Sequence, residues 1–364
     1  MRIMRTDFFL GANSPKGFCG LYDELEQIAD TEDLMILTGG PGVGKSTMMK
    51  AFGREAEELG LRVEYIHCSG DPASLDAVML PELGITAADG TAPHILTPRY
   101  PIAVDRLVDL GRFYDVDRLK ERRAEILACT ANYRSEYAQA YECLRARRAV
   151  LAELEEGIIR GADRERLRRR LCNVWEHRKG KKRGRTGREH RRFLGGMTPA
   201  GRVWCTDTID TLCNCVYALQ DPYHLGAPIL EELKERIVQD GWDVIVCYDP
   251  DVPERIVHLL VPEEKLGFVT EDRAFSLPRK AERRIHTERL LQQELLRASR
   301  GALRLKERLA EALEEEGAEH LRLAGEKHGE LERIYRPFVD FDGVNEVTEQ
   351  ELQRLRRVAA QRQA

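Results

Sequence analysis

Short apolar segments alternate along the chain with longer segments in which apolar residues recur at helical spacing. In the first half, Leu34–Leu37 and Arg62–Cys68 have the pattern of buried strands, and 46–59 between them has the pattern of a helix. Ile85–Asp89 is a further short apolar run. Strands that alternate with helices of this length predict right-handed βαβ units and a parallel sheet.

The second half repeats this order. A shift of 181 residues, from Pro41 to Pro222, also brings the strand patterns onto Val216–Leu219 and Asp243–Tyr248 and the helix onto 228–240. A fixed offset between similar segments indicates an internal duplication. A short amphipathic helix is expected ahead of the first strand of each unit, over 18–30 and 203–213.

Each unit continues into a long charged helical segment, 103–178 in the first and 279–335 in the second. Leucines at near-helical spacing in the latter predict a helical hairpin packed on itself or on the sheet. Thr348 and Glu351 have the spacing of a capping box, which predicts that a final helix starts there.

The strongest chemical signal is a glycine-rich motif with the spacing G-x-x-x-x-G-K-[ST], which follows the first strand and opens the next helix. Its residues are Gly39, Gly40, Pro41, Gly42, Val43, Gly44, Lys45, Ser46 and Thr47. Glycines allow the backbone N–H groups to converge on phosphate oxygens, and the helix N-terminus adds a positive dipole. We expect a P-loop in which Lys45 reaches the β- and γ-phosphates of a nucleoside triphosphate and Ser46 ligates Mg²⁺.

A site of this kind also needs an acidic group for the magnesium shell. Asp89 ends a short apolar run and is the first choice, as a catalytic and metal residue. Asp71 and Asp76 follow the second strand and are alternatives, although either could instead cap a turn or helix. His94 could sense the γ-phosphate or touch an acceptor, but the pattern favours a histidine in a surface loop.

The second unit lacks these groups. At the same offset its loop has Gly226 in place of the lysine, Ala227 in place of the magnesium serine and Pro228 in place of Thr47. Asp221 adds negative charge near the phosphate position. We therefore expect a structural or regulatory copy that does not bind Mg²⁺ and nucleotide in the same way.

The charge pattern bears on possible partners, and the cysteine pattern bears on the cellular compartment. Residues 164–192 carry fourteen Lys or Arg against three Glu, which is typical of a flexible linker, but the run could contact nucleic acid or, like Arg99, supply an arginine finger. Nine scattered cysteines, without a secretory signal or a long apolar span, indicate the reducing cytoplasm and no membrane insertion.

The predicted organisation is α/β, with two tandem P-loop NTPase-like parallel-sheet units that each carry long helical appendages. The expected segments are a first unit at 1–102, a helical segment and basic linker at 103–192, a degenerate second unit at 193–278 and a C-terminal helical segment at 279–364.

Four segments carry a resemblance to a known family: FFLGANSPKGF at 8–18, the glycine-rich motif, 67–76 and 89–94. Together they resemble a poorly characterised bacterial family of duplicated P-loop proteins labelled ATPase or nucleotide-kinase-like. Members of that family carry a P-loop in both halves, so Gly226 is a departure that argues against two active sites. The resemblance implies ATP binding and supplies no acceptor.

The expected function is therefore Mg²⁺-dependent ATP hydrolysis at the first unit. A kinase acting on a small molecule or nucleotide is the first alternative, and a nucleotide-dependent regulatory protein that binds nucleic acid through 164–192 is the second. Oligomeric state is not predicted by the sequence.

Overall fold

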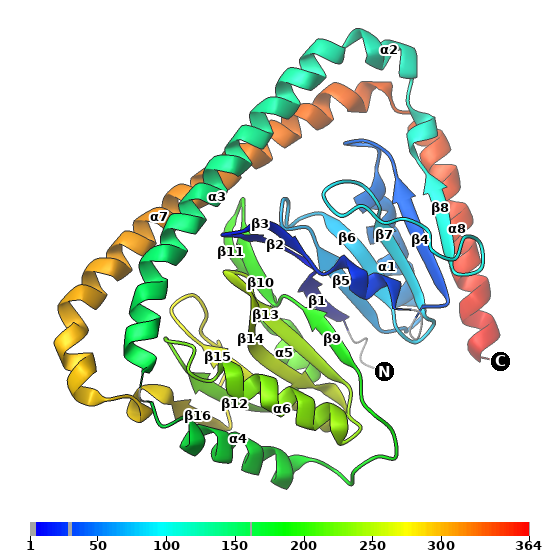
Figure 1. Cartoon of the computed structure of the whole chain (residues 1–364). Coiled ribbons are helices and arrows are strands. Elements are labelled where there is room, and N and C mark those ends of the chain that lie inside the picture. The colour runs from blue at the N-terminus through cyan, green and yellow to red at the C-terminus, as the bar shows by residue number, and fades with distance from the viewer. Residues whose placement is uncertain (1–4, 28–30, 161, 364) are drawn as a thin grey trace.

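The apolar segments of the first half form a six-stranded sheet (Figure 1). The computed structural model describes residues 5–27, 31–160 and 162–363. The strand order is β1 (Arg5–Phe9), β5 (Val63–His67), β6 (Leu75–Leu80), β7 (Ile85–Asp89), β4 (Asp33–Thr38) and β8 (Asp105–Asp109). The prediction of a wholly parallel sheet is wrong, because β6 runs antiparallel to both neighbours. The connections 68–74 and 81–84 are too short for the crossover that a parallel neighbour needs.

The second half forms another six-stranded sheet with the same topology. Its order is β9 (Glu189–Arg192), β13 (Val244–Asp249), β14 (Val252–Val261), β15 (Leu266–Glu271), β12 (Cys215–Gln220) and β16 (Arg283–His286). Here β14 is the strand that runs antiparallel to both neighbours, and the other pairings are parallel. The offset in the sequence is thus accompanied by a repeated order of strands in a mixed α/β fold.

One helix of each half packs on its own sheet at the predicted place. These are α1 (Lys45–Glu58) and α6 (Ala227–Gln239). α1 buries Met48, Met49, Phe52 and Ala56, the spacing of one helical face. Both helices begin and end within a residue of the predicted bounds.

Of the two helices expected before the first strands, the one at 18–30 is wrong, and the one at 203–213 is confirmed over most of its length. Residues 17–20 form β3 (Gly17–Gly20), followed by the 3-10 helix η1 (Tyr22–Glu26), and 203–213 contains the end of β11 (Gly201–Trp204) and α5 (Thr206–Leu212). Gly17 and Gly201 have φ of 97° and 84°, the left-handed conformation that suits a tight hairpin turn. The remainder of the first predicted helix, 28–30, lies outside the described residues.

These hairpins join the two halves. A four-stranded sheet has the order β11, β10 (Gly195–Thr198), β2 (Gly11–Ser14) and β3, so each half supplies one hairpin. Next to it, Phe9 and Phe193 exchange two backbone hydrogen bonds of 2.9 Å. Both phenylalanine side chains are buried in a core to which both halves contribute. The halves therefore share one interior.

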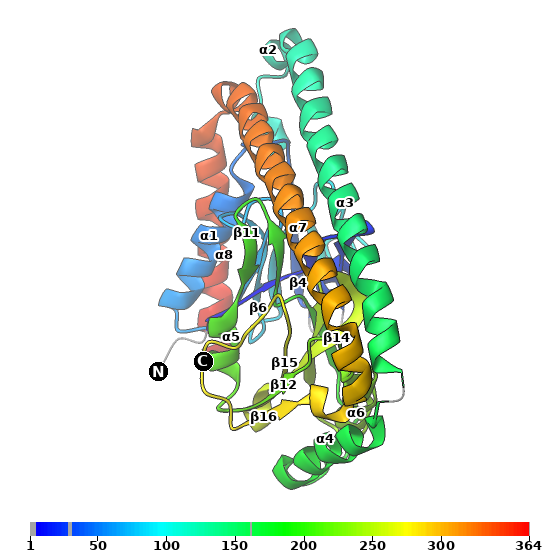
Figure 2. The same cartoon turned by 90° about the vertical axis from the view of Figure 1, so that its left-hand side faces the viewer.

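Two long helices, one from each half, run side by side in opposite directions along the molecule (Figure 2). They are α3 (Arg123–Ile159), which follows α2 (Val116–Glu121), and α7 (Gln293–Tyr335). The Cys129 thiol donates to the Lys327 carbonyl (3.2 Å), and His320 lies 2.8 Å from Glu136. The predicted hairpin within one half is therefore wrong: the partner of each long helix comes from the other half.

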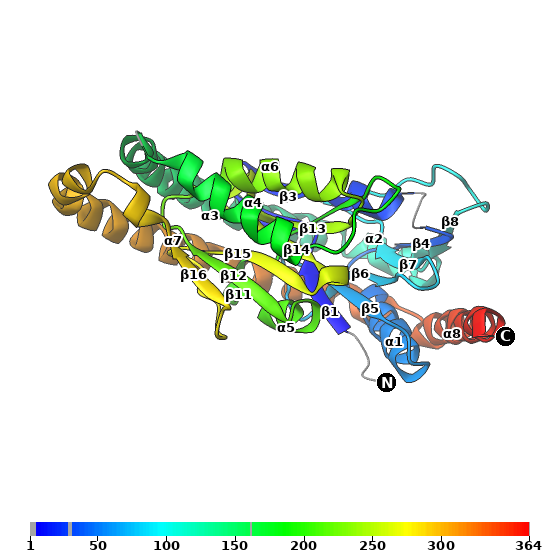
Figure 3. The ribbon, with the colours of Figure 1, turned by 90° about the horizontal axis from the view of Figure 1, so that it is seen from below.

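The next helices continue this exchange. α4 (Arg164–Arg178) follows α3 but packs on α6, and α8 (Phe341–Gln363) follows α7 but packs on α1 (Figures 1 and 3). Trp175 of α4 is fully buried and donates to Asp240 at 2.9 Å. The segment expected as a flexible linker is thus partly α4 and β9. Thr348 lies inside α8 and donates to the Val344 carbonyl, so the predicted capping box is wrong.

Four short 3-10 helices complete the described elements used below: η3 (Gly111–Phe113), η4 (Pro262–Glu264), η5 (Thr287–Leu290) and η6 (Arg336–Phe338). In the described ranges, no helix combines the length and apolarity that crossing a bilayer requires.

A buried ion cluster fixes the long helices to the second half. Arg147 of α3 and Arg202 of β11 donate to Asp251, between β13 and β14, at 2.7 and 2.8 Å. Arg202 also donates to Glu314 of α7 at 2.5 Å, and Arg147 forms an ion pair with the same carboxylate. The two guanidinium groups hold the pKa of Asp251 below its ordinary value, against the effect of burial. Each charge in the cluster is therefore compensated.

Replacing Asp251 with Ala should lower the free energy of unfolding by about 3 to 5 kcal/mol, because two buried arginines lose a counter-charge. Since the folded pKa lies below the ordinary value, this stabilisation is complete above about pH 4 and is lost as the pH falls through the folded value. Urea denaturation at pH 7 and pH 3 tests both statements.

The matched control is Glu142→Gln, which removes an exposed ion pair with Arg145 on the same helix. It should change stability by less than about 0.5 kcal/mol. Equal effects of the two substitutions would contradict the assignment of the cluster as the anchor of α3.

Candidate functional site

The glycine-rich segment forms a loop between β4 and α1. Gly39, Gly42 and Gly44 have φ of 140°, 73° and 104°, values that strain any residue with a side chain. A Cβ on Gly42 would also lie 3.3 Å from the Glu332 carbonyl oxygen of α7. The sequence needs glycine here because the loop turns sharply and α7 packs directly on it.

This loop borders a cavity of about 560 Å³. Pro41 to Thr47 line the cavity, whereas Gly39 and Gly40 lie behind it and accept hydrogen bonds from Lys45 Nζ at 2.7 and 3.2 Å. The start of α1 thus faces the cavity with its first N–H groups, which have no partner inside the helix. Seven of the nine predicted loop residues therefore line the cavity, and the other two contact it through Lys45.

Asp89 lies beside Lys45, as a strand end next to the loop requires. β7 pairs in parallel with β4, and Leu37 is opposite Asp89 in this register. Asp89 Oδ2 is 3.6 Å from Lys45 Nζ, and both side chains are largely buried. The other oxygen, Oδ1, accepts from the Thr91 N–H (2.8 Å) and hydroxyl (2.6 Å). One carboxylate oxygen is therefore held in place while the other faces the lysine.

The remaining predicted residues also line the cavity, but they differ in exposure and in hydrogen bonding. The Ser46 hydroxyl accepts from Leu75 N–H at 3.0 Å, which leaves one lone pair. Asp71 is exposed and accepts from Ser74 and from Ala73 N–H within its own turn. Of the two alternatives to Asp89, Asp71 is thus part of a turn at the rim, and Asp76 belongs to a buried polar cluster.

That cluster lies at the inner end of the cavity. Asp76 accepts from the Tyr22 hydroxyl at 2.6 Å and is 3% exposed. Burial raises its pKa, while His94, Tyr22 and Cys68 act in the opposite direction. Burial and the neighbouring Asp76 raise the pKa of Cys68 as well.

The expectation of a surface histidine at 94 is wrong. His94 is 8% exposed, its ring stacks on Tyr22 with centroids 4.5 Å apart, and Nε2 lies 3.7 Å from Asp76. Neither ring nitrogen has a hydrogen-bond partner among the described residues. A buried imidazole with both nitrogens unpaired has a hydrogen-bonding capacity that a ligand in the cavity could use.

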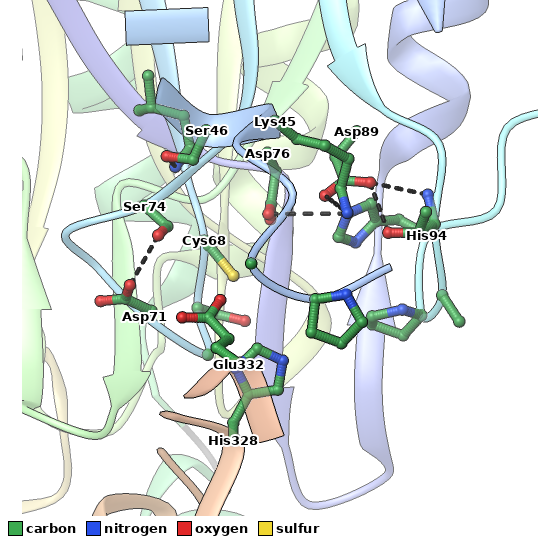
Figure 4. Close-up of a pocket in the computed structure, with 18 of the residues that line it drawn as sticks. Lys45, Ser46, Cys68, Asp71, Ser74, Asp76, Asp89, His94, His328 and Glu332 are labelled. Atoms are coloured by element: carbon green, nitrogen blue, oxygen red, sulfur yellow. Dashed lines mark hydrogen bonds and ion pairs between the residues drawn. The ribbon is translucent and has the colours of Figure 1, made fainter. Parts of the chain in front are cut away.

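The opposite wall comes from the paired helices, and Figure 4 shows His328 and Glu332 of α7 on that side. α3 contributes Tyr133, Arg134, Tyr137 and Tyr141, the end of α7 contributes His328 and Glu332, and η6 contributes Arg336. Sequence reasoning missed these residues. The tyrosines recur every four residues, which places them on one helical face and is a signal that the pattern already contained.

Two of these wall residues bear on the expected arginine finger. Arg99 forms an ion pair with Glu26 and does not line the cavity. Arg134 and Arg336 do line it, and neither has an ion-pair partner within the described ranges, although Arg336 lies over the Phe341 ring. The arginines that line the cavity therefore come from α3 and η6, and not from 164–192.

The matching loop of the second half is filled by its own side chain. Asp221 is 1% exposed and accepts from Leu225 N–H (2.9 Å), Gly226 N–H (2.7 Å) and the Thr287 hydroxyl (2.7 Å). The Asp221 carboxylate therefore takes up two backbone N–H groups of this loop. The equivalent cavity, lined by Pro222, His224, Asp249, Asp251, Asp272 and five arginines among others, measures only about 40 Å³.

The described residues contain no group of three or more His, Cys, Asp or Glu side chains arranged around a common metal position. Mg²⁺ at a nucleotide site takes only one or two protein ligands and is otherwise held by phosphate and water. Ser46 and Asp89 have that chemistry, so the residues present fit this ion.

Comparison with known proteins identifies no family: no family model, no curated protein and no solved structure matches the chain. Any functional conclusion has to come from the geometry of the cavity.

Replacing Tyr22 with Phe should destabilise the protein by about 1 to 3 kcal/mol, because the buried Asp76 carboxyl loses its hydroxyl donor. Loss of this donor should also raise the pKa of Asp76 further. Tyr100→Phe is the control, since Tyr100 is 48% exposed. Denaturation midpoints that match for the two variants would show that the Tyr22 hydroxyl contributes nothing.

Proposed function

We propose that the chain binds a nucleoside triphosphate, ATP in the first instance, in the cavity beside residues 39–47 and hydrolyses it with Mg²⁺. The observation that carries this proposal is the convergence of the glycine-rich loop, Lys45 and Asp89 at the mouth of one large cavity. A strand, a loop with glycines in the left-handed conformation and a helix N-terminus form a site for phosphate.

The residues divide into three roles. Loop N–H groups and the start of α1 bind the phosphates, and Lys45 can leave the Gly39 and Gly40 carbonyls to reach the terminal phosphates. Ser46 and Asp89 would hold Mg²⁺. The bound ion would supply positive charge that bridges the β- and γ-oxygens.

Under this proposal the long helices α3 and α7, with η6, complete the site. Arg134 and Arg336 can place positive charge near the γ-phosphate, the role that an arginine finger performs. α3 and α7 also shield the cavity from water, which strengthens these interactions. A site of this type catalyses by positioning and charge stabilisation, so it needs no nucleophilic side chain from the protein.

The relation between the two halves is part of the same proposal. We infer two tandem P-loop NTPase-like units of common origin, of which only the first retains a lysine and a magnesium hydroxyl. Asp221 supports this reading because it takes the amides that a phosphate would need. The family resemblance of the sequence is consistent with it.

A kinase is the second candidate, and a specific observation favours it. The cavity continues past the loop to the unpaired ring nitrogens of His94, to Asp76 and to the tyrosine wall. Asp76 could accept the proton of an acceptor hydroxyl, as the catalytic aspartate of kinases does. ATP turnover would then depend on an added acceptor, whereas an ATPase releases phosphate without one.

Replacing Lys45 with Ala should lower the rate of phosphate release at least about 100-fold and weaken ATP binding, because the loop loses its only lysine next to the phosphates. Gly226→Lys in the second half should leave both quantities nearly unchanged, since Asp221 keeps the amides. Phosphate release and binding of Mg²⁺ and ATP are measured for the parent and both variants.

Lys120→Ala, at an exposed position on α2, controls for the loss of one lysine. Unchanged denaturation midpoints show that each variant is folded. If ATP binds normally to the Lys45 variant, the proposed site is wrong. If the parent binds ATP but releases phosphate only with an added acceptor, the kinase replaces the ATPase.

A further inference from the structure

A basic groove runs along the outer edge of the second sheet, away from the cavity described above. Two adjoining hollows of about 330 and 530 Å³ lie between α4 and the edge strand β16, and they share Arg170 and Arg283. The first is also lined by Arg166, Arg284, His286 and Arg289, and the second by Asn173, His177, Tyr217 and Glu282, which pairs with Arg178. The groove is concave, and its charged lining residues are arginines except for Glu282.

Its residues have a regular spacing. Arg166, Arg170 and His177 are separated by four and seven residues, so they follow one face of α4. This row extends over about 16 Å, at about 1.5 Å per residue. A single phosphate could contact only one part of it, whereas a chain of phosphates could follow all of it.

Most of these arginines lack acidic partners. Within the described ranges, Arg166, Arg170, Arg283 and Arg289 take part in no ion pair, whereas their neighbours Arg168, Arg178 and Arg284 pair with Glu165, Glu282 and Glu271. Burial, together with repulsion from Arg283, Arg166 and Arg289, lowers the pKa of Arg170. The groove thus concentrates cations that the fold itself does not neutralise.

The first half provides an internal comparison, because α8 packs there as α4 does in the second half. Three of its arginines are paired: Arg106 of β8 with Asp33 and Glu351, Arg354 with Asp33, and Arg356 with Glu55 and Glu349. The same arrangement of helix, edge strand and 3-10 helix can therefore be neutral. Unpaired charge at α4 is a property of the second half and not a requirement of the topology.

We propose that the groove between α4 and β16 binds the phosphate backbone of a nucleic acid strand. The unpaired arginines contact successive phosphates and release counterions, so binding depends strongly on salt. Tyr217 is 8% exposed and Arg178 lies over its ring at 5.8 Å, so this tyrosine offers no free face for base stacking. The interaction is therefore electrostatic and independent of sequence.

The test is fluorescence anisotropy of the full chain with labelled 20-nucleotide single-stranded and duplex oligonucleotides at several salt concentrations. The charge-reversing pair Arg170→Glu and Arg283→Glu should weaken binding at least tenfold and reduce the slope of log K against log salt by about 2, one for each lost phosphate contact. The milder pair Arg170→Gln and Arg283→Gln should lower both the affinity and the salt slope. Because it introduces no new charge, it distinguishes loss of phosphate contacts from misfolding.

The matched control is Arg169→Glu with Arg308→Glu, which changes net charge equally at exposed positions outside the groove. It should retain at least half of the parent affinity. Equal weakening by the control pair, or parent binding unaffected by the groove variants, would overturn the proposal. So would binding only to vesicles of anionic lipid, or a shortened oligonucleotide of two residues that binds as tightly as the 20-mer. None of these results depends on ATP binding at residues 39–47.

Discussion

The arrangement of the whole molecule depends on the buried cluster of Arg147, Arg202, Asp251 and Glu314. Its charges compensate one another, which is the condition for burying ions at acceptable cost. Because Arg147 belongs to α3 and Glu314 to α7, the cluster fixes both long helices to the second half. The same helices then extend over the glycine-rich loop of the first half and form the far wall of its cavity. The first half alone would lack that wall.

The two halves have one topology and differ in what fills the equivalent position. In the first half the loop beside Lys45 opens on a cavity of about 560 Å³. In the second half, Asp221 takes the loop amides and the cluster around Asp251 leaves about 40 Å³. Side chains thus fill that position in the second half. The exchange of α4 and α8 between halves, and the shared sheet that contains β2 and β10, make the two units structurally dependent on each other.

Local patterns predicted the local structure well. The strand, loop and helix around 34–59 follow from apolar runs and from glycines that only a tight turn needs, and Asp89 was placed beside Lys45 because neighbouring strand ends share an edge. What failed depends on distant contacts. The antiparallel β6, the exchanged helices and the burial of His94 against Tyr22 are decided by packing between segments far apart in the sequence. The tyrosines on α3 have a visible spacing, but the sequence does not say which surface that face meets.

The central claim is that the first half binds nucleotide at residues 39–47, whereas in the second half the Asp221 carboxylate takes the amides of the equivalent loop. Calorimetric titration of the full chain with Mg²⁺ and a non-hydrolysable ATP analogue measures the number of nucleotides bound per chain. The account predicts one. Two would contradict the filled loop at Asp221, and none would contradict the nucleotide site at Lys45.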